Sequence, residues 1–214
     1  MLIYRRESDL WRLLFNLFYF NNVKTAPPHW KRELERLGGP ERFEWPEAWG
    51  AREPLVAVLG FNLMPNHMHL ILKELVEGGV STFMHRVGMG YAKFINEKYN
   101  ESGSLFQGTF RSRAVNDDAY LRYLAVYVMV KNAFELYPGG LENALEHFEE
   151  AYALAVQSPF NSLAEYAGKR QSPLVERDLL GELFESPQEF KEFARECILD
   201  QLEQMQEIEA VFAL

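Results

Sequence analysis

The chain has 214 residues, 48% of them hydrophobic, and a formal net charge of −9 at pH 7. This size is typical of one globular domain, with or without an appended segment, and no apolar run approaches the roughly 18 residues that a membrane-spanning helix needs. The single cysteine, Cys197, excludes an internal disulfide and a cysteine-based metal site, and the charged N-terminal residues indicate a cytoplasmic protein.

The first quarter of the chain contains one dense apolar segment and one short helix. Leu10–Phe20 is rich in aromatic and aliphatic residues and ends at two asparagines, which predicts a buried strand, with a helix as the open alternative. His29–Leu37 is predicted to be a short helix, because it lies between a pair of prolines and a pair of glycines. Residues 40–53 are interrupted by prolines and tryptophans and are expected to be irregular.

A β-hairpin is predicted next. Leu55–Asn62 and His67–Leu72 are mostly apolar, as expected of two buried strands. Met64–Asn66 is predicted to be the turn between them, because proline fixes φ and asparagine tolerates turn geometry.

Two longer helices follow, separated by a loop. Val80–Tyr99 has apolar residues at helical spacing, and residues 100–110 form a polar, glycine-containing loop. Arg111–Val115 is predicted to be a short fourth strand. Asp117–Asp118 favours a helix start, since acidic groups stabilise the positive N-terminal end, and the helix is expected to run over about residues 119–136.

The order of elements predicts an α+β fold with one antiparallel sheet and helices on one face, followed by amphipathic helices. Basic and acidic residues are distributed unequally on the two sides of residue 137. Residues 1–137 hold 17 lysines and arginines against 15 acidic residues, whereas residues 138–214 hold 5 against 16. We therefore expect a domain at residues 1–137 that can present a basic surface, and an acidic helical C-terminal extension at residues 138–214.

Two histidines interrupt the second strand of the hairpin. His67 and His69 are two apart, so their side chains point to the same face, and Met68 points to the other. Two imidazoles on one face can bind one metal ion, although two surface histidines would have the same spacing. Polar groups inside an otherwise apolar strand favour the metal site. Its open coordination positions would suit an ion that polarises a phosphate oxygen.

The helix expected after residue 118 supplies a nucleophile. Tyr120, Tyr123 and Tyr127 are spaced i, i+3, i+7 and share one stripe, which for the first two indicates core packing. A tyrosine facing the histidines could attack a phosphodiester next to a metal ion. Lys131 and Asn132 lie about one turn further on and could reach the same site.

Four segments resemble, in their order and spacing, the REP-associated tyrosine transposases, which are part of the histidine-hydrophobe-histidine (HUH) single-tyrosine transposases. A later segment, Ser158–Gly168, is similar to the one that follows the catalytic domain in that group, so that the resemblance covers most of residues 55–170. The four segments are Met64–Leu72 (MPNHMHLIL), Met84–Asn100, Gly103–Val115 and Ala119–Glu135.

The resemblance implies a ferredoxin-like (RRM-like) catalytic domain that cuts and transfers single-stranded or hairpin DNA with Mg²⁺ or Mn²⁺. It implies that Tyr127 attacks the phosphodiester, becomes linked to the 5′-phosphate and releases a 3′-OH. It also implies that His67 and His69 bind the metal ion. Relatives place these residues in one chain or across a homodimer, and both arrangements stay open here.

The sequence departs from the family pattern after the tyrosine. The pattern is Tyr-Ile-x-x-Asn-Pro, but this chain has Lys131 in place of the asparagine and Asn132 in place of the proline. A charged lysine cannot ligate a metal but can hold a phosphate. Asn132 could supply the missing ligand after a small helical shift. The departure and the net acidity also fit an alternative, a host-retained hairpin-DNA-binding protein with weak or no catalysis.

Other residues are candidates for contact with DNA. Arg111 and Arg113 alternate on the predicted short strand and are interpreted as phosphate contacts, with solvated surface charge as the alternative. Gln107 could hydrogen-bond an unpaired base, and Phe106 could stack on one or fold inward. Tyr91 is a second candidate nucleophile, although its helix position fits packing or base stacking better. The acidic extension is a candidate for protein interaction, with solubility as the simpler role.

Overall fold

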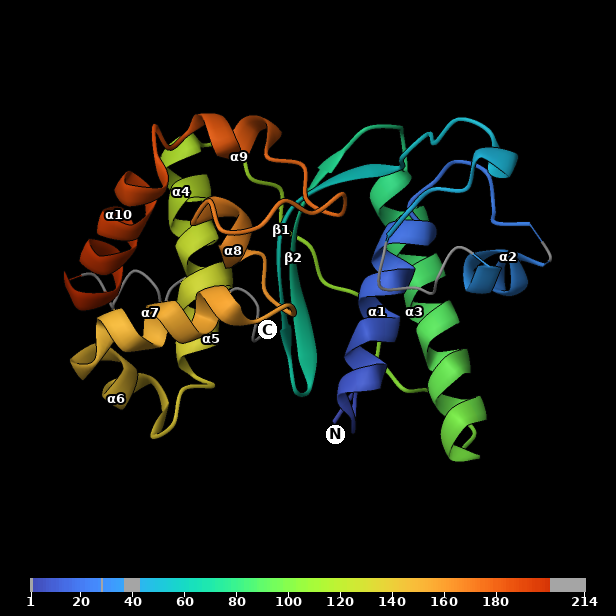
Figure 1. Cartoon of the computed structure of the whole chain (residues 1–214), viewed down its shortest axis with the longest axis horizontal. Coiled ribbons are helices and arrows are strands. Elements are labelled where there is room, and N and C mark those ends of the chain that lie inside the picture. The colour runs from blue at the N-terminus through green and yellow to red at the C-terminus, as the bar shows by residue number, and fades with distance from the viewer. Residues whose placement is uncertain (1, 28, 37–42, 201–214) are drawn as a thin grey trace. The chain divides into compact units, whose positions relative to one another are not determined.

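The computed structural model of the chain describes residues 2–27, 29–36 and 43–200 (Figure 1). In chain order, its elements are α1 (Glu7–Tyr19), α2 (Trp30–Arg36), η2 (Glu47–Trp49), β1 (Val56–Met64), β2 (His67–Glu74), α3 (Gly79–Tyr99), α4 (Asp118–Val126), η3 (Tyr127–Lys131), α5 (Asn132–Phe134), α6 (Gly140–Glu146), α7 (Phe148–Gln157), α8 (Leu163–Tyr166), α9 (Asp178–Glu182) and α10 (Pro187–Asp200).

The described residues form two compact units, and both include part of the β-hairpin. The first unit takes the described residues of Met1–Ala57, Pro65–His67 and Leu72–Phe110, and the second takes those of Val58–Met64, Met68–Ile71 and Arg111–Leu214. The domain boundary predicted between residues 137 and 138 stays a prediction, since the described helices on both its sides lie in the second unit.

The predicted hairpin is confirmed. β1 and β2 pair through the two-residue turn Pro65–Asn66, so the strands are antiparallel. β1 is buried along its whole length, whereas β2 is exposed at both ends. Among the described residues, β1 and β2 are the two strands of the sheet. One isolated antiparallel bridge also pairs Asn62 of β1 with Asn161.

The strand predicted at Leu10–Phe20 is wrong, because this segment forms α1. Asp9 fixes the start of the helix: its carboxylate accepts hydrogen bonds from the backbone N–H groups of Arg5 (2.9 Å) and Arg6 (3.0 Å). Apolar positions recur at the helical spacing of three and four, but extra aromatic residues between them hide that period in the sequence. The buried apolar residues are Leu10, Leu13, Leu14, Phe15, Leu17, Phe18 and Tyr19.

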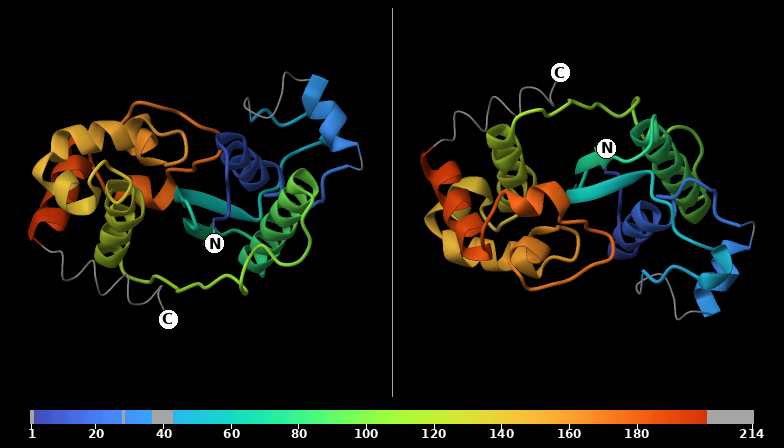
Figure 2. Two further views of the ribbon diagram at one scale, coloured as in Figure 1. Left: turned by 90° about the horizontal axis from the view of Figure 1, so that it is seen from below. Right: turned by 90° about the horizontal axis from the view of Figure 1, so that it is seen from above.

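Helices α1 and α3 are the centre of the first unit. They run side by side in all three views (Figures 1 and 2). The predicted helix Val80–Tyr99 is confirmed as α3, whose buried residues Phe83, Val87, Tyr91 and Ile95 recur every four positions. This stripe lets α3 bury one continuous face.

Two other predictions for the first unit agree with the described residues. The short helix predicted at His29–Leu37 is present as α2, and Leu37 with its neighbouring glycines lies outside the described residues. The predicted irregular insertion, residues 40–53, contains the 3-10 turn η2 within its described part, residues 43–53.

The fourth strand predicted at Arg111–Val115 is wrong. These residues are extended but pair with no strand among the described residues. Residues 111–114 are all exposed, so this segment has no apolar face to bury against a sheet. The fold therefore contains helices and a small antiparallel sheet, as an α+β class requires, but the four-stranded ferredoxin-like arrangement is not confirmed.

The second unit is mostly helical. The helix expected over residues 119–136 begins where predicted, because the Asp117 carboxylate accepts the backbone N–H of Tyr120 at 2.7 Å. It does not continue as a regular α-helix, since residues 127–131 wind as a π-helix between α4 and α5. The predicted C-terminal helices are present as α6 to α10, with α10 packing on α4. Among the described helices, none is both long and apolar enough to cross a membrane.

Candidate active site

The predicted nucleophile meets one of the two predicted metal ligands. The rings of Tyr127 and His69 lie edge to face in the second unit, with centroids 5.5 Å apart and planes at 78°. Tyr127 is 3% exposed, and His69 is half-buried on the strand β2. A phenol and an imidazole in contact, from a strand and a helix far apart in sequence, form the centre of the candidate site.

His67, the second predicted metal ligand, lies two residues before His69 on the same strand. Strand alternation places His67 and His69 on one face of β2, and His67 is exposed. The Nδ1 of His67 lies 2.7 Å from the Oδ1 of Asn66, so the ring N–H donates to this amide. That hydrogen bond orients the His67 ring. The sequence assigned Asn66 to the turn alone and missed this contact, although its position next to a candidate ligand was a signal.

The lysine that replaces the family asparagine lies beside the nucleophile. The Nζ of Lys131 is 5.3 Å from the centroid of the Tyr127 ring, and Lys131 is almost completely buried. The same ammonium forms an ion pair with the Oε1 of Glu135 at 2.6 Å. A positive charge is therefore held close to the phenol, and Glu135 compensates it.

The π-helical turn changes which backbone N–H bonds to the carbonyl of the nucleophile. The backbone N–H of Asn132 donates to the carbonyl of Tyr127, a turn one residue longer than that of an α-helix. In an α-helix the residue at i+4 lies over residue i. Here the longer turn bonds the backbone of Asn132, at i+5, to that of Tyr127, while the ammonium of Lys131, at i+4, still lies beside the Tyr127 ring. Asn132 is 2% exposed, and its Nδ2 has no hydrogen-bond partner among the described residues.

The donors available to a metal ion fit the expected kind of site. No group of three or more histidine, cysteine, aspartate or glutamate side chains that could hold an ion is found in the described part of the chain. The set of ligands expected from the sequence has only two such side chains, both histidines, and its third member is an asparagine amide. His67, His69 and Asn132 would supply nitrogen and oxygen donors and would leave positions open for water and phosphate oxygens.

Tyr91 is packed in the core of the first unit. It is 0% exposed, and its hydroxyl donates to the carbonyl of Ile3 at 2.9 Å. Burial, with the nearby Asp9 carboxylate, raises the pKa of Tyr91 well above its usual value. The burial and hydrogen bond of Tyr91 favour the packing role, and its DNA contact and its role as a second nucleophile stay predictions.

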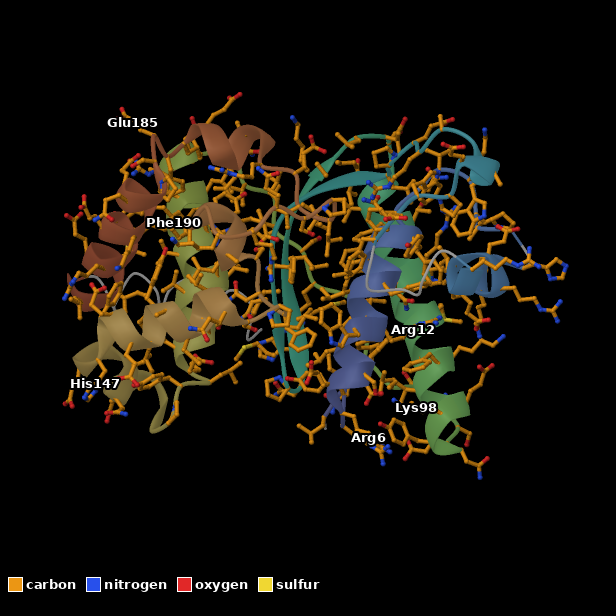
Figure 3. All side chains as sticks on the ribbon, viewed as in Figure 1. Arg6, Arg12, Lys98, His147, Glu185 and Phe190 are labelled. Carbon is orange, nitrogen blue, oxygen red and sulfur yellow. The ribbon has the colours of Figure 1, made fainter. Side chains whose placement is uncertain are left out.

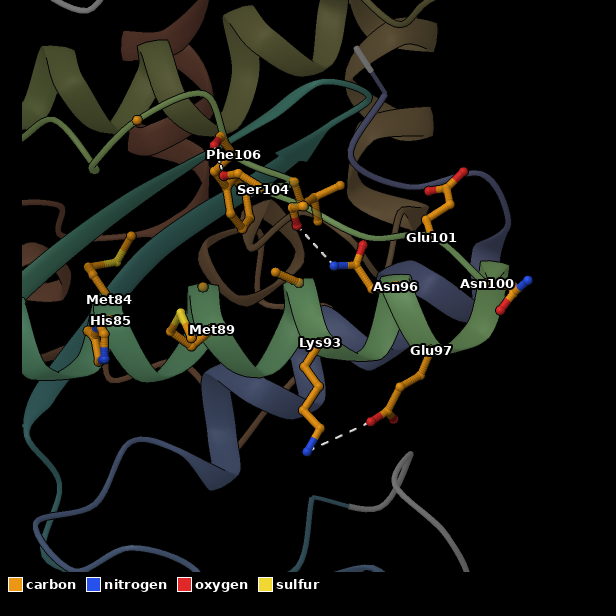
Figure 4. Close-up of a pocket in the computed structure, with 15 residues that line it drawn as sticks. Met84, His85, Met89, Lys93, Asn96, Glu97, Asn100, Glu101, Ser104 and Phe106 are labelled. Atoms are coloured by element: carbon orange, nitrogen blue, oxygen red, sulfur yellow. Dashed lines mark hydrogen bonds and ion pairs between the residues drawn. The ribbon is translucent and has the colours of Figure 1, made fainter.

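Phe106 folds inward, as one of its two predicted alternatives required. Its ring lies 6.5 Å from that of Tyr91, and the loop that carries it passes over α3 (Figure 4). Loop and helix line a groove of about 830 Å³ in the first unit, with Met84 and Met89 on the helix side. Gln107, the next residue in this loop, is exposed and free to approach a ligand sterically.

The two arginines predicted to contact phosphates are exposed. Arg111 and Arg113 lie in the extended segment that precedes α4, and the guanidinium of Arg113 is 5.0 Å from the centroid of the Tyr120 ring. Stacking on an aromatic ring orients a guanidinium without neutralising it. Contact of Arg111, Arg113 and Gln107 with DNA stays a prediction.

The family comparison agrees with this combination of hairpin and tyrosine helix. Residues 51–131 match the family model described as "Transposase IS200 like". The matching segment contains the hairpin, α3 and Tyr127. No curated protein and no solved structure matched the chain.

The class of protein defined by the matching segment is a transposase, a protein that acts on DNA. Within that class, the match of residues 51–131 supports the IS200-like (Y1) transposase family. The family predicted from the sequence is thereby confirmed, and the closer likeness to the REP-associated group stays a prediction.

Proposed function

We propose that the protein is a single-stranded DNA endonuclease and strand transferase that works through a phosphotyrosine intermediate on Tyr127. The contact between the rings of Tyr127 and His69 is the observation that carries this proposal. It brings a nucleophilic hydroxyl to the strand with two histidines, in a chain segment of transposase sequence. The substrate is single-stranded or hairpin DNA in the cytoplasm, and the chain acts alone or as a homodimer.

His67, His69 and Asn132 would hold the divalent ion, Mg²⁺ or Mn²⁺. When bound, such an ion withdraws negative charge from phosphate oxygens and so lowers the barrier to attack. Asn66 would orient the ring of His67 through the hydrogen bond between its Oδ1 and the Nδ1 of the histidine. The ion-paired ammonium of Lys131 lies beside the phenol and can exchange Glu135 for a phosphate oxygen.

The proposed reaction is a transesterification. The Tyr127 oxygen forms a bond to phosphorus and gives its proton to solvent, and the bond from phosphorus to the 3′ oxygen breaks. The 3′ oxygen takes up a proton and leaves as a 3′-OH, while the 5′ end stays on the tyrosine. Attack by another 3′-OH reverses these steps and joins the strands. Contacts of Arg111, Arg113 and Gln107 with phosphates or bases of the DNA are part of the same proposal.

Covalent capture tests this function. Labelled single-stranded hairpin DNA incubated with Mn²⁺ and the wild-type chain should give a protein–DNA adduct that survives denaturing gel electrophoresis. Tyr127→Phe should abolish the adduct. Tyr123→Phe is the matched control, because Tyr123 lies on the same helix but packs on Phe193, with ring centroids 5.3 Å apart. An adduct formed by Tyr127→Phe, or none by the wild type across a broad set of hairpins, would contradict the proposal.

A second function, hairpin-DNA binding without cleavage, is favoured by one observation. Tyr127 is almost fully buried, and the ammonium beside it is already paired with Glu135. Such a protein would bind hairpin DNA with an affinity that falls steeply with salt, because phosphate contacts release counterions. Binding of this kind without any adduct would replace the first proposal by the second.

A further inference from the structure

The segment Ser158–Gly168, which resembles part of the transposase group, has no task in the proposed chemistry. In the structure its first residues lie along β1, within the second unit. The backbone N–H of Leu63 donates to the carbonyl of Phe160 at 3.0 Å, and the N–H of Ser162 donates to the carbonyl of Phe61 at 3.0 Å. The segment is thus attached to the strand at two points on either side of Asn161.

The side chain of Asn161 uses both ends of its amide. Its Oδ1 accepts the backbone N–H of Leu163 at 2.7 Å, and its Nδ2 donates to the carbonyl of Met129 at 2.7 Å. The residue is 1% exposed. Arg170 donates to its backbone carbonyl at 2.5 Å and binds Glu165 through two hydrogen bonds of 2.7 and 2.8 Å. Asn161 is therefore a rigid donor aimed at one carbonyl.

That carbonyl belongs to the middle of the π-helical turn, Tyr127–Lys131. Insertion of a side chain into the hydrogen-bond ladder of a helix is one established cause of local distortion, and π-turns are less favourable than α-turns without such support. A buried carbonyl in a distorted turn also needs a donor, which Asn161 supplies.

The chain has one residue more between Tyr127 and the next asparagine than the family pattern has. A regular α-helix would bond the backbone N–H of Lys131 to the carbonyl of Tyr127, whereas the π-turn bonds the backbone N–H of Asn132 to it. We propose that Asn161 is a positioning residue that holds this π-turn and thereby keeps Asn132 beside the nucleophile. The inference rests on the proposed function, because it gives Asn132 its role at the metal site.

Four full-length proteins test the inference: wild type, Asn161→Ala, a deletion of Lys131, and the combination of the two changes. Deleting Lys131 shortens the turn by one residue, so a regular α-helix then places the asparagine over Tyr127 without help. We expect Asn161→Ala to weaken Mn²⁺ binding by about tenfold in the wild-type background, as loss of a group that orients a ligand does. In the deletion background the same substitution should leave Mn²⁺ binding unchanged. Titration of free Mn²⁺ by electron paramagnetic resonance measures both.

The matched control is Ser162→Ala. Ser162 belongs to the same segment, and its Oγ accepts the backbone N–H of Phe61 at 2.8 Å, but it does not bond to the π-turn. This variant should bind Mn²⁺ as the wild type does. Equal losses in both variants would indicate a structural role for the whole segment and would overturn the inference. So would an Asn161→Ala variant with full Mn²⁺ affinity, or with the same loss in both backgrounds.

Hydrogen exchange separates this inference from the proposed function and keeps it testable if the deletion variant does not fold. Asn161→Ala should exchange the amides of residues 127–132 at least about tenfold faster than Ser162→Ala does, with α1 unchanged in both. Unchanged exchange in the π-turn would overturn the role of Asn161 whatever the metal data are. A wild-type chain that binds no Mn²⁺ would instead overturn the metal site of the proposed function.

Discussion

Asp9 joins the two long helices of the first unit through a single carboxylate. It caps the start of α1, and it also accepts hydrogen bonds from the Nζ of Lys98 at 2.5 Å and the hydroxyl of Tyr99 at 2.7 Å. Arg6 and Lys98 lie at the same end of the helix pair (Figure 3). Burial alone would raise the pKa of Asp9, but these bonds and those from the backbone of Arg5 and Arg6 outweigh it, so the pKa is lowered.

The lowered pKa of Asp9 gives a prediction for stability against pH. The folded state holds the carboxylate ionised, so its contribution is present above the unfolded pKa of about 3.9 and is lost as pH falls through the lower folded value. Asp9→Asn should cost about 2–4 kcal/mol at pH 7, since it leaves the Lys98 ammonium without its partner. In urea unfolding, the difference from wild type should shrink below pH 4. A difference that stays constant from pH 7 to pH 3 would contradict this account.

At the level of elements, α3 packs against the ring of Phe20, the residue that follows α1, at a glycine. A Cβ placed on Gly90 would clash with the Phe20 ring, with three ring atoms inside van der Waals contact. A Cβ on Gly88, two residues earlier on the same helix, would come no closer than 3.9 Å to Phe106. A substitution at Gly88 therefore tests helix propensity alone, whereas a substitution at Gly90 also tests packing.

Alanine substitutions at these glycines should change stability in opposite directions. Gly88→Ala should stabilise the first unit by up to about 1 kcal/mol, the propensity difference between the two residues. Gly90→Ala should destabilise it by about 1–3 kcal/mol, because the methyl group displaces the Phe20 ring. Chemical unfolding measures both. If Gly90→Ala were as stabilising as Gly88→Ala, α1 and α3 would not pack as closely as the structure shows.

The sequence predicts elements well where local chemistry decides them. The hairpin follows from a proline–asparagine turn between two apolar runs, and the start of α4 follows from Asp117. It fails for α1, where aromatic residues around the whole helix conceal its period. It also fails for Arg111–Val115, whose alternation of charged and small residues has no buried face.

The candidate site, too, could be predicted from the sequence only in part. The meeting of Tyr127 and His69 follows from a family pattern in the sequence. The π-turn does not, because the residues Val128–Lys131 would suit a regular helix equally well. Its support is a hydrogen bond from Asn161, a residue that is distant in sequence. Only the displaced position of Asn132 in the pattern indicates that the helix must change its winding.

At the level of the whole molecule, the acidic C-terminal part packs on α5 and on β1 within the second unit. Phe148 packs on Phe134 with ring centroids 5.4 Å apart, and the hydroxyl of Tyr166 donates to the carbonyl of Leu59 at 2.6 Å. Part of its negative charge is internal, since Glu149 pairs with Lys191 at 2.5 Å. The charge of this part and its structural role are therefore separate properties.

A chain that ends at Tyr137 tests the structural role. It would expose Phe134 and the carbonyl of Leu59, and it would lose the hydrogen bond to the π-turn, so the second unit should fail to fold cooperatively. We expect loss of the urea unfolding transition and of DNA binding. A truncated chain that unfolds cooperatively and binds hairpin DNA would show instead that residues 1–137 form an independent domain, as the charge distribution predicts.

The full chain with Glu142→Gln and Glu146→Gln tests the charge separately. Both glutamates are exposed on or at the end of α6, so their neutralisation should leave the unfolding transition unchanged. If the acidity serves solubility, the affinity for hairpin DNA should stay within about twofold of wild type, because exposed charges more than a Debye length of about 8 Å from the DNA are screened at physiological salt. A clear increase in affinity, largest at low salt, would show that this surface repels DNA and guides it toward Tyr127.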